Sequence, residues 1–232
     1  MTTYIRMADS PRKIAMTAGV FYLLTFVSIP TLSLYVPVHD PNYIIGNGPD
    51  TNVFIGVILE LIVALTGIGT AVSLYPLLKK QNASIALGLV GSRVLEAATI
   101  FTGAAFLLAI VTLRQSGVGS DGIVTGKALA ALYDRMFLVG QSLMPAVTDL
   151  LLGYLLYKSR LVPRTLALVG LAGAPMLVAG HLSVLFGIVG QRDPLTFVFA
   201  ILVAVFEFSL GILLVVKGFN SSSPLLKNYI TR

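Results

Sequence analysis

Hydrophobic residues fill six long runs along this chain, and short polar segments separate the runs. Each run is near or above the roughly 20 residues that an α-helix needs to cross a bilayer. Within the runs, polar and small residues recur at spacings of three, four, seven and eleven, the periodicity of one helix face. The pattern predicts an all-α polytopic transmembrane six-helix bundle with helices over residues 14–34, 53–78, 84–113, 128–157, 165–189 and 195–216.

The segments between the runs are too short to fold as separate soluble domains. We therefore expect residues 1–232 to form a single transmembrane domain. The first run follows Arg12 and Lys13, as in a signal peptide, but it is as long as a span and no small-x-small cleavage site follows Pro30. It is therefore predicted to be a retained first helix. The Ser-rich tail at 220–224 is predicted to be mobile.

Basic residues concentrate in alternate loops, which predicts the orientation of the bundle. The positive-inside rule places the more basic side in the cytoplasm, so both termini are expected there. Tyr75, Tyr154 and Tyr157 near this side, with Tyr35 and Tyr133 near the other, are predicted to be interfacial aromatic anchors. The residues on the basic side are Arg6, Arg12, Lys13, Lys79, Lys80, Lys158, Arg160, Arg164, Lys217, Lys227 and Arg232.

The composition places the chain outside the soluble range, because 56% of its residues are hydrophobic and only 11% are charged. Its formal net charge of +6 comes from bases at helix ends. Anionic lipid is therefore the expected partner of these bases, and nucleic acid is not expected. The chain has no cysteine and two histidines, so we expect no metal site and no cofactor.

Several ionisable side chains lie inside the apolar runs, where each costs roughly 3 kcal/mol on insertion scales. Such residues usually pair, bind a ligand or line water, so they predict an interior polar site. Prolines inside the fourth and fifth runs, Pro145 and Pro175, are typical of a kink or the edge of a cavity. The candidate substrate- or ion-binding residues are Glu60, Arg93, Glu96, Asp134, Arg135, Gln141, Asp149, His181 and Glu207.

Position along the helices predicts that these groups form two layers. At 1.5 Å per residue, an inner layer lies roughly 12 to 14 Å from the cytoplasmic edge and contains Arg93, Asp149 and Glu207. An outer layer lies roughly 9 to 12 Å from the opposite edge and contains Glu60, Glu96, Asp134 and Arg135, with His181 somewhat shallower.

Acids outnumber bases in both layers. Protons or cations would neutralise the surplus. A structural alternative is that Arg93 bridges Asp149 and Glu207 while Arg135 pairs with Glu60.

Three segments resemble a bacterial membrane-protein family known as domain of unknown function 4386. They are residues 18–25 (AGVFYLLT), 93–97 (RVLEA) and 153–164 (GYLLYKSRLVPR). The resemblance spans nearly the whole chain. It implies a compact multi-helix bundle in a bacterial plasma membrane, and it implies no activity.

Three functions are compatible with these residues. The first is binding or transport of a proton, a cation or a small solute through the buried acids, with Arg93 as counter-charge. The second is a non-catalytic accessory, sensor or structural protein, which would form homo-oligomers or helix-to-helix contacts through small-residue faces.

The third function is an intramembrane hydrolase. Gly140-Gln141-Ser142 and His181 resemble the serine and histidine of rhomboid proteases, but Leu143 stands where that motif has glycine. Since Ser142 falls near mid-helix, no loop frees its backbone for an oxyanion hole. No motif fixes a reaction, so the sequence favours a protein that is not an enzyme.

Overall fold

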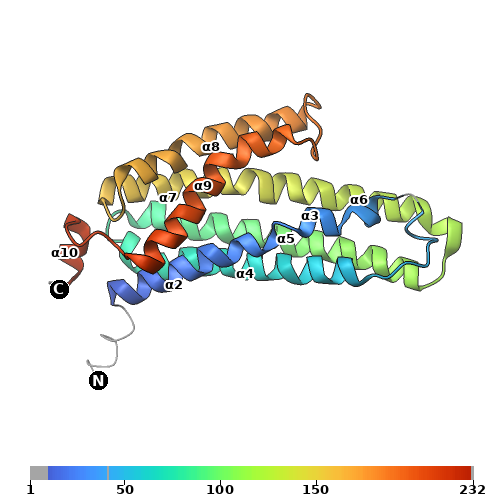
Figure 1. Ribbon diagram of the computed structural model, residues 1–232, viewed down its shortest axis with the longest axis horizontal. Coiled ribbons are helices and arrows are strands. Elements are labelled where there is room, and N and C mark those ends of the chain that lie inside the picture. The colour runs from blue at the N-terminus through green and yellow to red at the C-terminus, as the bar shows by residue number, and fades with distance from the viewer. Residues whose placement is uncertain (1–9, 41, 231–232) are drawn as a thin grey trace, which may run out of the picture.

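The computed structural model describes residues 10–40 and 42–230, which form a helical bundle without strands (Figure 1). Six stretches are long and apolar enough to cross a membrane, which confirms the predicted six-helix architecture of a membrane-embedded protein. The start of α2 and the C-terminal helix α10 lie at one end of the bundle, here called the termini end. The six spans are Pro11–Leu34, Thr51–Leu78, Ala83–Gln115, Gly119–Ser159, Arg164–Leu185 and Leu195–Val216.

Four of the spans are single helices, whereas the first and the fourth are composite. The single helices are α4 (Thr51–Leu78), α5 (Ala83–Gln115), α8 (Arg164–Leu185) and α9 (Leu195–Val216). The first span contains α2 (Pro11–Leu24), the 3₁₀ turn η1 (Thr25–Ser28) and α3 (Thr31–Leu34). The fourth contains the 3₁₀ turn η3 (Gly119–Gly122), α6 (Ile123–Phe137), the π-turn η4 (Leu138–Leu143) and α7 (Met144–Ser159).

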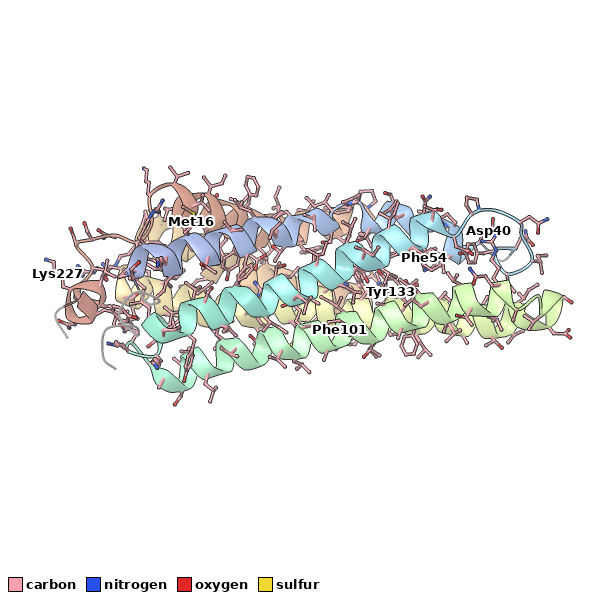
Figure 2. All side chains as sticks on the ribbon, turned by 90° about the horizontal axis from the view of Figure 1, so that it is seen from below. Met16, Asp40, Phe54, Phe101, Tyr133 and Lys227 are labelled. Carbon is pink, nitrogen blue, oxygen red and sulfur yellow. The ribbon has the colours of Figure 1, made fainter. Side chains whose placement is uncertain are left out.

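The spans close into a ring in which α2, α4, α5, α7, α8 and α9 each pack on the next, and α9 returns to α2. Glycines permit the α2–α9 contact: a Cβ on Gly19 would lie 2.8 Å from the carbonyl oxygen of Gly211. Outside the ring, large apolar side chains face outward, including Met16, Phe54 and Phe101 (Figure 2), each about two-fifths exposed. Such a surface fits a lipid environment.

The first span breaks because Pro30 has no N–H and hydroxyls upstream compete for the backbone. Thr25 Oγ1 donates to the Tyr22 carbonyl at 2.7 Å, and Ser28 Oγ donates to the Thr25 carbonyl at 3.2 Å. The chain tightens into η1 there and resumes as α3. As a result, α2 packs closely on α9, whereas the outer half of the first span makes few contacts with α9. The continuous first helix predicted from the sequence is therefore wrong over this break.

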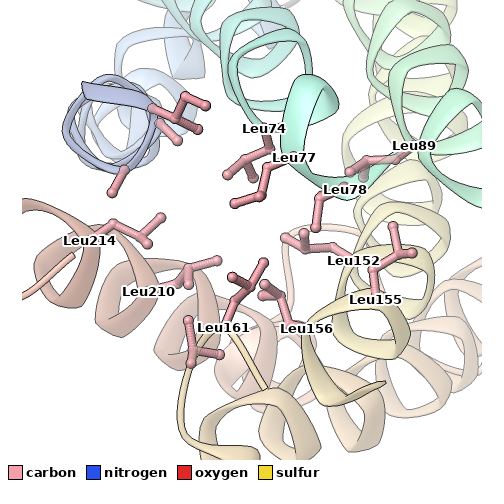
Figure 3. Close-up of a cluster of buried hydrophobic side chains, with 14 of the residues drawn as sticks. Leu74, Leu77, Leu78, Leu89, Leu152, Leu155, Leu156, Leu161, Leu210 and Leu214 are labelled. Atoms are coloured by element: carbon pink, nitrogen blue, oxygen red, sulfur yellow. The ribbon is translucent and has the colours of Figure 1, made fainter. Parts of the chain in front are cut away.

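A leucine cluster fills the termini end of the ring (Figure 3). Each labelled leucine is at most 1% exposed, and together they seal the centre of the bundle. A second apolar cluster around Tyr35, Val57, Leu107 and Tyr133 fills the opposite end. The leucines are Leu74, Leu77, Leu78, Leu89, Leu152, Leu155, Leu156, Leu161, Leu210 and Leu214.

The C-terminal tail packs against the termini end of the bundle through hydrogen bonds. Ser223 is fully buried, and its Oγ donates to the Ser159 carbonyl at 2.6 Å. The backbone N–H of Asn220 also donates to the Leu161 carbonyl at 2.8 Å. Helix α10 (Pro224–Ile230) follows, and its Leu226 packs on the leucine cluster. Ser223 and Asn220 therefore donate the hydrogen bonds that hold the tail against the α7–α8 connection.

At the opposite end, Asp50 fastens the extramembrane segment before α4. Its carboxylate accepts hydrogen bonds from Tyr43 Oη at 2.7 Å, Arg114 Nη1 at 2.6 Å and Gln115 Nε2 at 3.0 Å. Burial opposes ionisation, but the bonds from Tyr43 and Gln115 and the Arg114 guanidinium outweigh it and lower the pKa of Asp50 below its ordinary value.

This arrangement predicts a pH-dependent loosening of the segment. Because the folded pKa of Asp50 is lowered, its contribution to stability is present above the ordinary range of about pH 4 and is lost as the pH falls through the folded pKa. The hydrogen-exchange protection factors of residues 42–50 should fall in acid in the native protein and be low at neutral pH in Asp50→Asn. Asp121→Asn, at an exposed site, is the matched control. Protection factors that do not change with pH in the native protein would contradict the prediction.

Candidate functional site

A guanidinium lies at the centre of the bundle between two carboxylates. Arg93 on α5 is 3% exposed; its Nη1 donates to Glu96 Oε2 at 2.9 Å, and its Nη2 donates to Glu207 Oε1 on α9. The Tyr22 ring of α2 lies 5.8 Å from Arg93 Cζ. The cluster therefore joins three spans and holds two acids on one base.

Asp149 on α7 adds a third carboxyl group near this cluster. It is fully buried and close enough to Arg93, Glu96 and Glu207 to sense their charges. Within the described part of the chain, neither of its oxygens has a hydrogen-bond partner. The structural alternative in which Arg93 bridges Asp149 and Glu207 is thus wrong, because the partner of Arg93 besides Glu207 is Glu96. The predicted division into two layers is also wrong for Glu96, which was assigned to the outer layer. Glu96 lies about one helical turn from Arg93, so its carboxylate bonds to the base of the inner layer.

Glu60 on α4 forms a separate buried site with two tyrosines. Its Oε1 accepts a hydrogen bond from Tyr133 Oη at 2.7 Å and a longer one from Gln141 Nε2 at 3.4 Å. Its Oε2 is buried without a hydrogen bond of normal geometry among the described residues, and the hydroxyl of the neighbouring Tyr35 is buried beside it. Gly56 makes room for Tyr35, since a Cβ there would lie 2.4 Å from the Tyr35 ring.

Tyr35 and Tyr133 are functional-site neighbours that the sequence did not reveal. Both are 2% exposed and pack edge to face with ring centroids 5.3 Å apart, so their predicted role as interfacial anchors is wrong. Figure 2 shows Tyr133 pointing into the bundle. The sequence signal for them was weak: Tyr35 lies two residues before Pro37, and Tyr133 directly precedes Asp134 and Arg135.

The π-turn η4 explains why Tyr133 faces Glu60. A π-turn adds a residue to one helical turn, which shifts the face of the preceding helix relative to the following one by about one position. Regular helical spacing from Gln141 and Asp149 places Asp134 on the interior face. In the structure, its neighbour Tyr133 has that place, and Asp134 turns toward His39 and Arg192 at the end opposite the termini.

Asp134 and Arg135 belong to a network at the end opposite the termini. Asp134 Oδ1 lies 3.1 Å from His39 Nε2 and 3.1 Å from Arg192 Nη2. Arg135 is exposed and bonds Gln191 at 3.2 Å, so the predicted pair of Arg135 with Glu60 is wrong. Gln191 Nε2 also donates to the Asp134 carbonyl at 3.0 Å. These contacts hold the α8–α9 loop against α6.

His181 on α8 supports the π-turn. It is 8% exposed, and its Nδ1 lies 3.1 Å from the Leu138 carbonyl oxygen. A carbonyl oxygen only accepts, so Nδ1 carries the proton. Ser142 is not hydrogen-bonded to His181 among the described residues, and the arrangement needed for a serine nucleophile is not formed.

Two cavities reach this region from the gap between the broken first span and α9. One of about 230 Å³ is lined by Arg93, Glu96 and Glu207 together with residues of η1 and α9. A second, of about 360 Å³, lies nearer the α8–α9 loop and is lined by Ser142, His181 and Arg192 among apolar side chains. Gln141, Leu177 and Ala200 line both cavities. The cavity of about 230 Å³ therefore reaches Glu96 and Glu207 between η1 and α9, while the leucine cluster fills the termini end.

No three His, Cys, Asp or Glu side chains of the described residues lie close enough together to hold a metal ion. The buried acids instead form two groups. Glu96, Asp149 and Glu207 lie around Arg93, and Glu60 lies apart with Tyr35 and Tyr133. What this arrangement can do chemically is exchange protons, because several buried carboxyl groups lie close together. A cavity reaches Glu96 and Glu207, whereas Asp149 and Glu60, whose unpartnered oxygens are buried, do not line it.

The fold and site define a polytopic helical membrane protein with a buried carboxylate–guanidinium cluster between the leucine cluster and the second apolar cluster. The chain belongs to the family described as domain of unknown function (DUF4386), whose model matches residues 17–218 and confirms the resemblance noted in the sequence. No curated protein and no solved structure matches the chain.

Proposed function

We propose that this protein binds protons at its buried carboxylates and exchanges them with the side of the membrane opposite its termini. The observation that carries the proposal is the grouping of Glu96, Asp149 and Glu207 around one guanidinium, with both oxygens of Asp149 unpartnered. Three ionised acids beside one base would leave net negative charge in a low-dielectric interior. Taking up a proton is the simplest way to remove it.

A proton fits this cluster better than a metal cation. Arg93 already lies between Glu96 and Glu207, and its positive charge repels a second cation at the same place. The described residues also lack a set of three ligating side chains. A small solute coupled to the proton would enter through the same cavities, which share Gln141, Leu177 and Ala200.

In the conformation that the structure describes, access is proposed from one side only, and transport across the membrane further requires that the leucine cluster open in turn. The leucine cluster leaves the termini end closed, whereas the 230 Å³ cavity reaches Arg93, Glu96 and Glu207 between η1 and α9. The concentration of bases at the termini end supports a cytoplasmic position for it in a bacterial plasma membrane. The cavities then face outward.

Proton flux into liposomes tests the proposal. Vesicles containing the protein and a trapped pH-sensitive dye should acidify under an inward proton gradient, and Asp149→Asn should return the flux to that of empty vesicles. Asparagine keeps the side-chain shape and cannot ionise, so the variant removes the proton-binding group with little change in packing. Asp121→Asn, at an exposed site outside the cluster, should leave flux unchanged.

Absence of flux under gradients of either direction would overturn the transport part of the proposal. Proton binding is tested separately by titrating unbuffered protein in nanodiscs, where Asp149→Asn should bind fewer protons than the native chain. If neither measurement distinguishes the variant, the charges are structural and the accessory or sensor function becomes the better explanation.

A further inference from the structure

The larger cavity contains a directional hydrogen-bond site that the proton-binding proposal does not use. It has a volume of about 360 Å³, within the range of small-molecule pockets. Most of its wall is apolar, formed by residues such as Leu32, Val184 and Phe197. The polar side chains of the wall are Ser33, Gln141, Ser142, His181, Gln191, Arg192 and Thr196.

His181 sets which kind of ligand the cavity can accept. Its Nδ1 donates to the Leu138 carbonyl, so in the neutral tautomer Nε2 is an acceptor. Nε2 has no hydrogen-bond partner among the described residues, although the ring is 8% exposed and lines the cavity. A molecule that satisfies Nε2 must donate a hydrogen bond to it.

We infer that this cavity binds a small apolar molecule bearing one hydroxyl or N–H donor, which bonds to His181 Nε2. A lipid acyl chain would fill the apolar volume but leave the buried histidine acceptor unmatched, at a cost in free energy. A charged solute would find the wall mainly apolar. A molecule with an apolar body and a single hydrogen-bond donor matches both the apolar wall and the Nε2 acceptor of His181.

The position of the cavity connects such a ligand to the rest of the bundle. Gln141 lines it and also donates to Glu60, while Ala200 and Leu177 line both this cavity and the one that reaches Glu207. The α8–α9 loop forms one wall and is held by the Asp134–Arg192 pair at 3.1 Å. Binding here would therefore contact three elements that also shape the carboxylate site.

The probes for the test are 2-naphthol and 2-methoxynaphthalene, which share an apolar ring system but differ in the donor. Protein with ¹⁵N-labelled histidine in nanodiscs gives signals from two histidines only, and His39→Gln assigns them. The free protein should show His181 with its proton on Nδ1. Addition of 2-naphthol should shift the Nε2 signal to saturation, and 2-methoxynaphthalene should bind roughly 10-fold more weakly.

Two variants separate specific binding from partition into lipid. Ala200→Phe should fill the cavity and abolish saturable binding of both probes. His181→Phe should remove the preference for 2-naphthol, and if it fails to fold, the comparison of the two probes in the native protein still decides the question. Equal affinity for both probes, a proton on Nε2 of His181, or binding unchanged in Ala200→Phe would each overturn the inference. Failure of 2-naphthol to bind because lipid occupies the cavity would overturn it as well, without affecting the proton-flux test.

Discussion

Replacing Arg93 by methionine should lower the free energy of unfolding by about 3–5 kcal/mol, the loss expected when one partner of a buried ion pair is removed. Arg93 is 3% exposed and is bonded to both Glu96 and Glu207. Without it, three neighbouring acids would share the bundle centre with no positive charge. Denaturant unfolding in detergent measures the change.

A compensated variant tests whether charge is the cause. Arg93→Met combined with Glu96→Gln and Glu207→Gln removes the base and both paired acids, so most of the lost stability should return. Arg135→Met is the matched control, because Arg135 is exposed and bonds Gln191 alone among the described residues; its effect should stay within about 0.5 kcal/mol. Unchanged stability of Arg93→Met alone would show that the acids are neutral without Arg93.

Gly140→Ala should destabilise the bundle by about 3 kcal/mol, the upper part of the range for overpacking. A Cβ at position 140 would lie 1.8 Å from Thr99 Oγ1 and 2.6 Å from Thr99 Cβ. Turning the Thr99 side chain does not remove the second contact, so α5 and the π-turn must separate. That movement would draw Gln141 away from Glu60.

The double variant Gly140→Ala/Thr99→Gly should be no less stable than Thr99→Gly alone, because the clashing atoms are gone. Gly91→Ala is the matched control on α5, where an added Cβ meets nothing within 4 Å. It should be neutral or slightly stabilising, since alanine favours helix by up to about 1 kcal/mol over glycine. Equal effects of Gly140→Ala and Gly91→Ala in the same unfolding assay would contradict the close approach.

Sequence spacing located several members of the site but not their partners. Periodicity correctly placed Glu60, Arg93, Glu96, Asp149 and Glu207 on interior faces, and all five are buried. It misplaced Asp134, because the π-turn shifts the helical phase and regular spacing assumes an unbroken α-helix. It also placed Tyr35 at the interface, because the break in the first span that brings the chain inward depends on Pro30 and on hydroxyl hydrogen bonds.

The sequence by itself determined the environment, the number of spans and which faces avoid lipid, because these depend on run length, hydrophobicity and local periodicity. Only the tertiary structure decided that Arg93 binds Glu96 and Glu207, that Asp149 has free oxygens, and that cavities open beside the broken first span. Pairing between spans depends on helix rotation, on breaks and on close glycine contacts. Those arise from side chains distant in the sequence, so no local pattern encodes them.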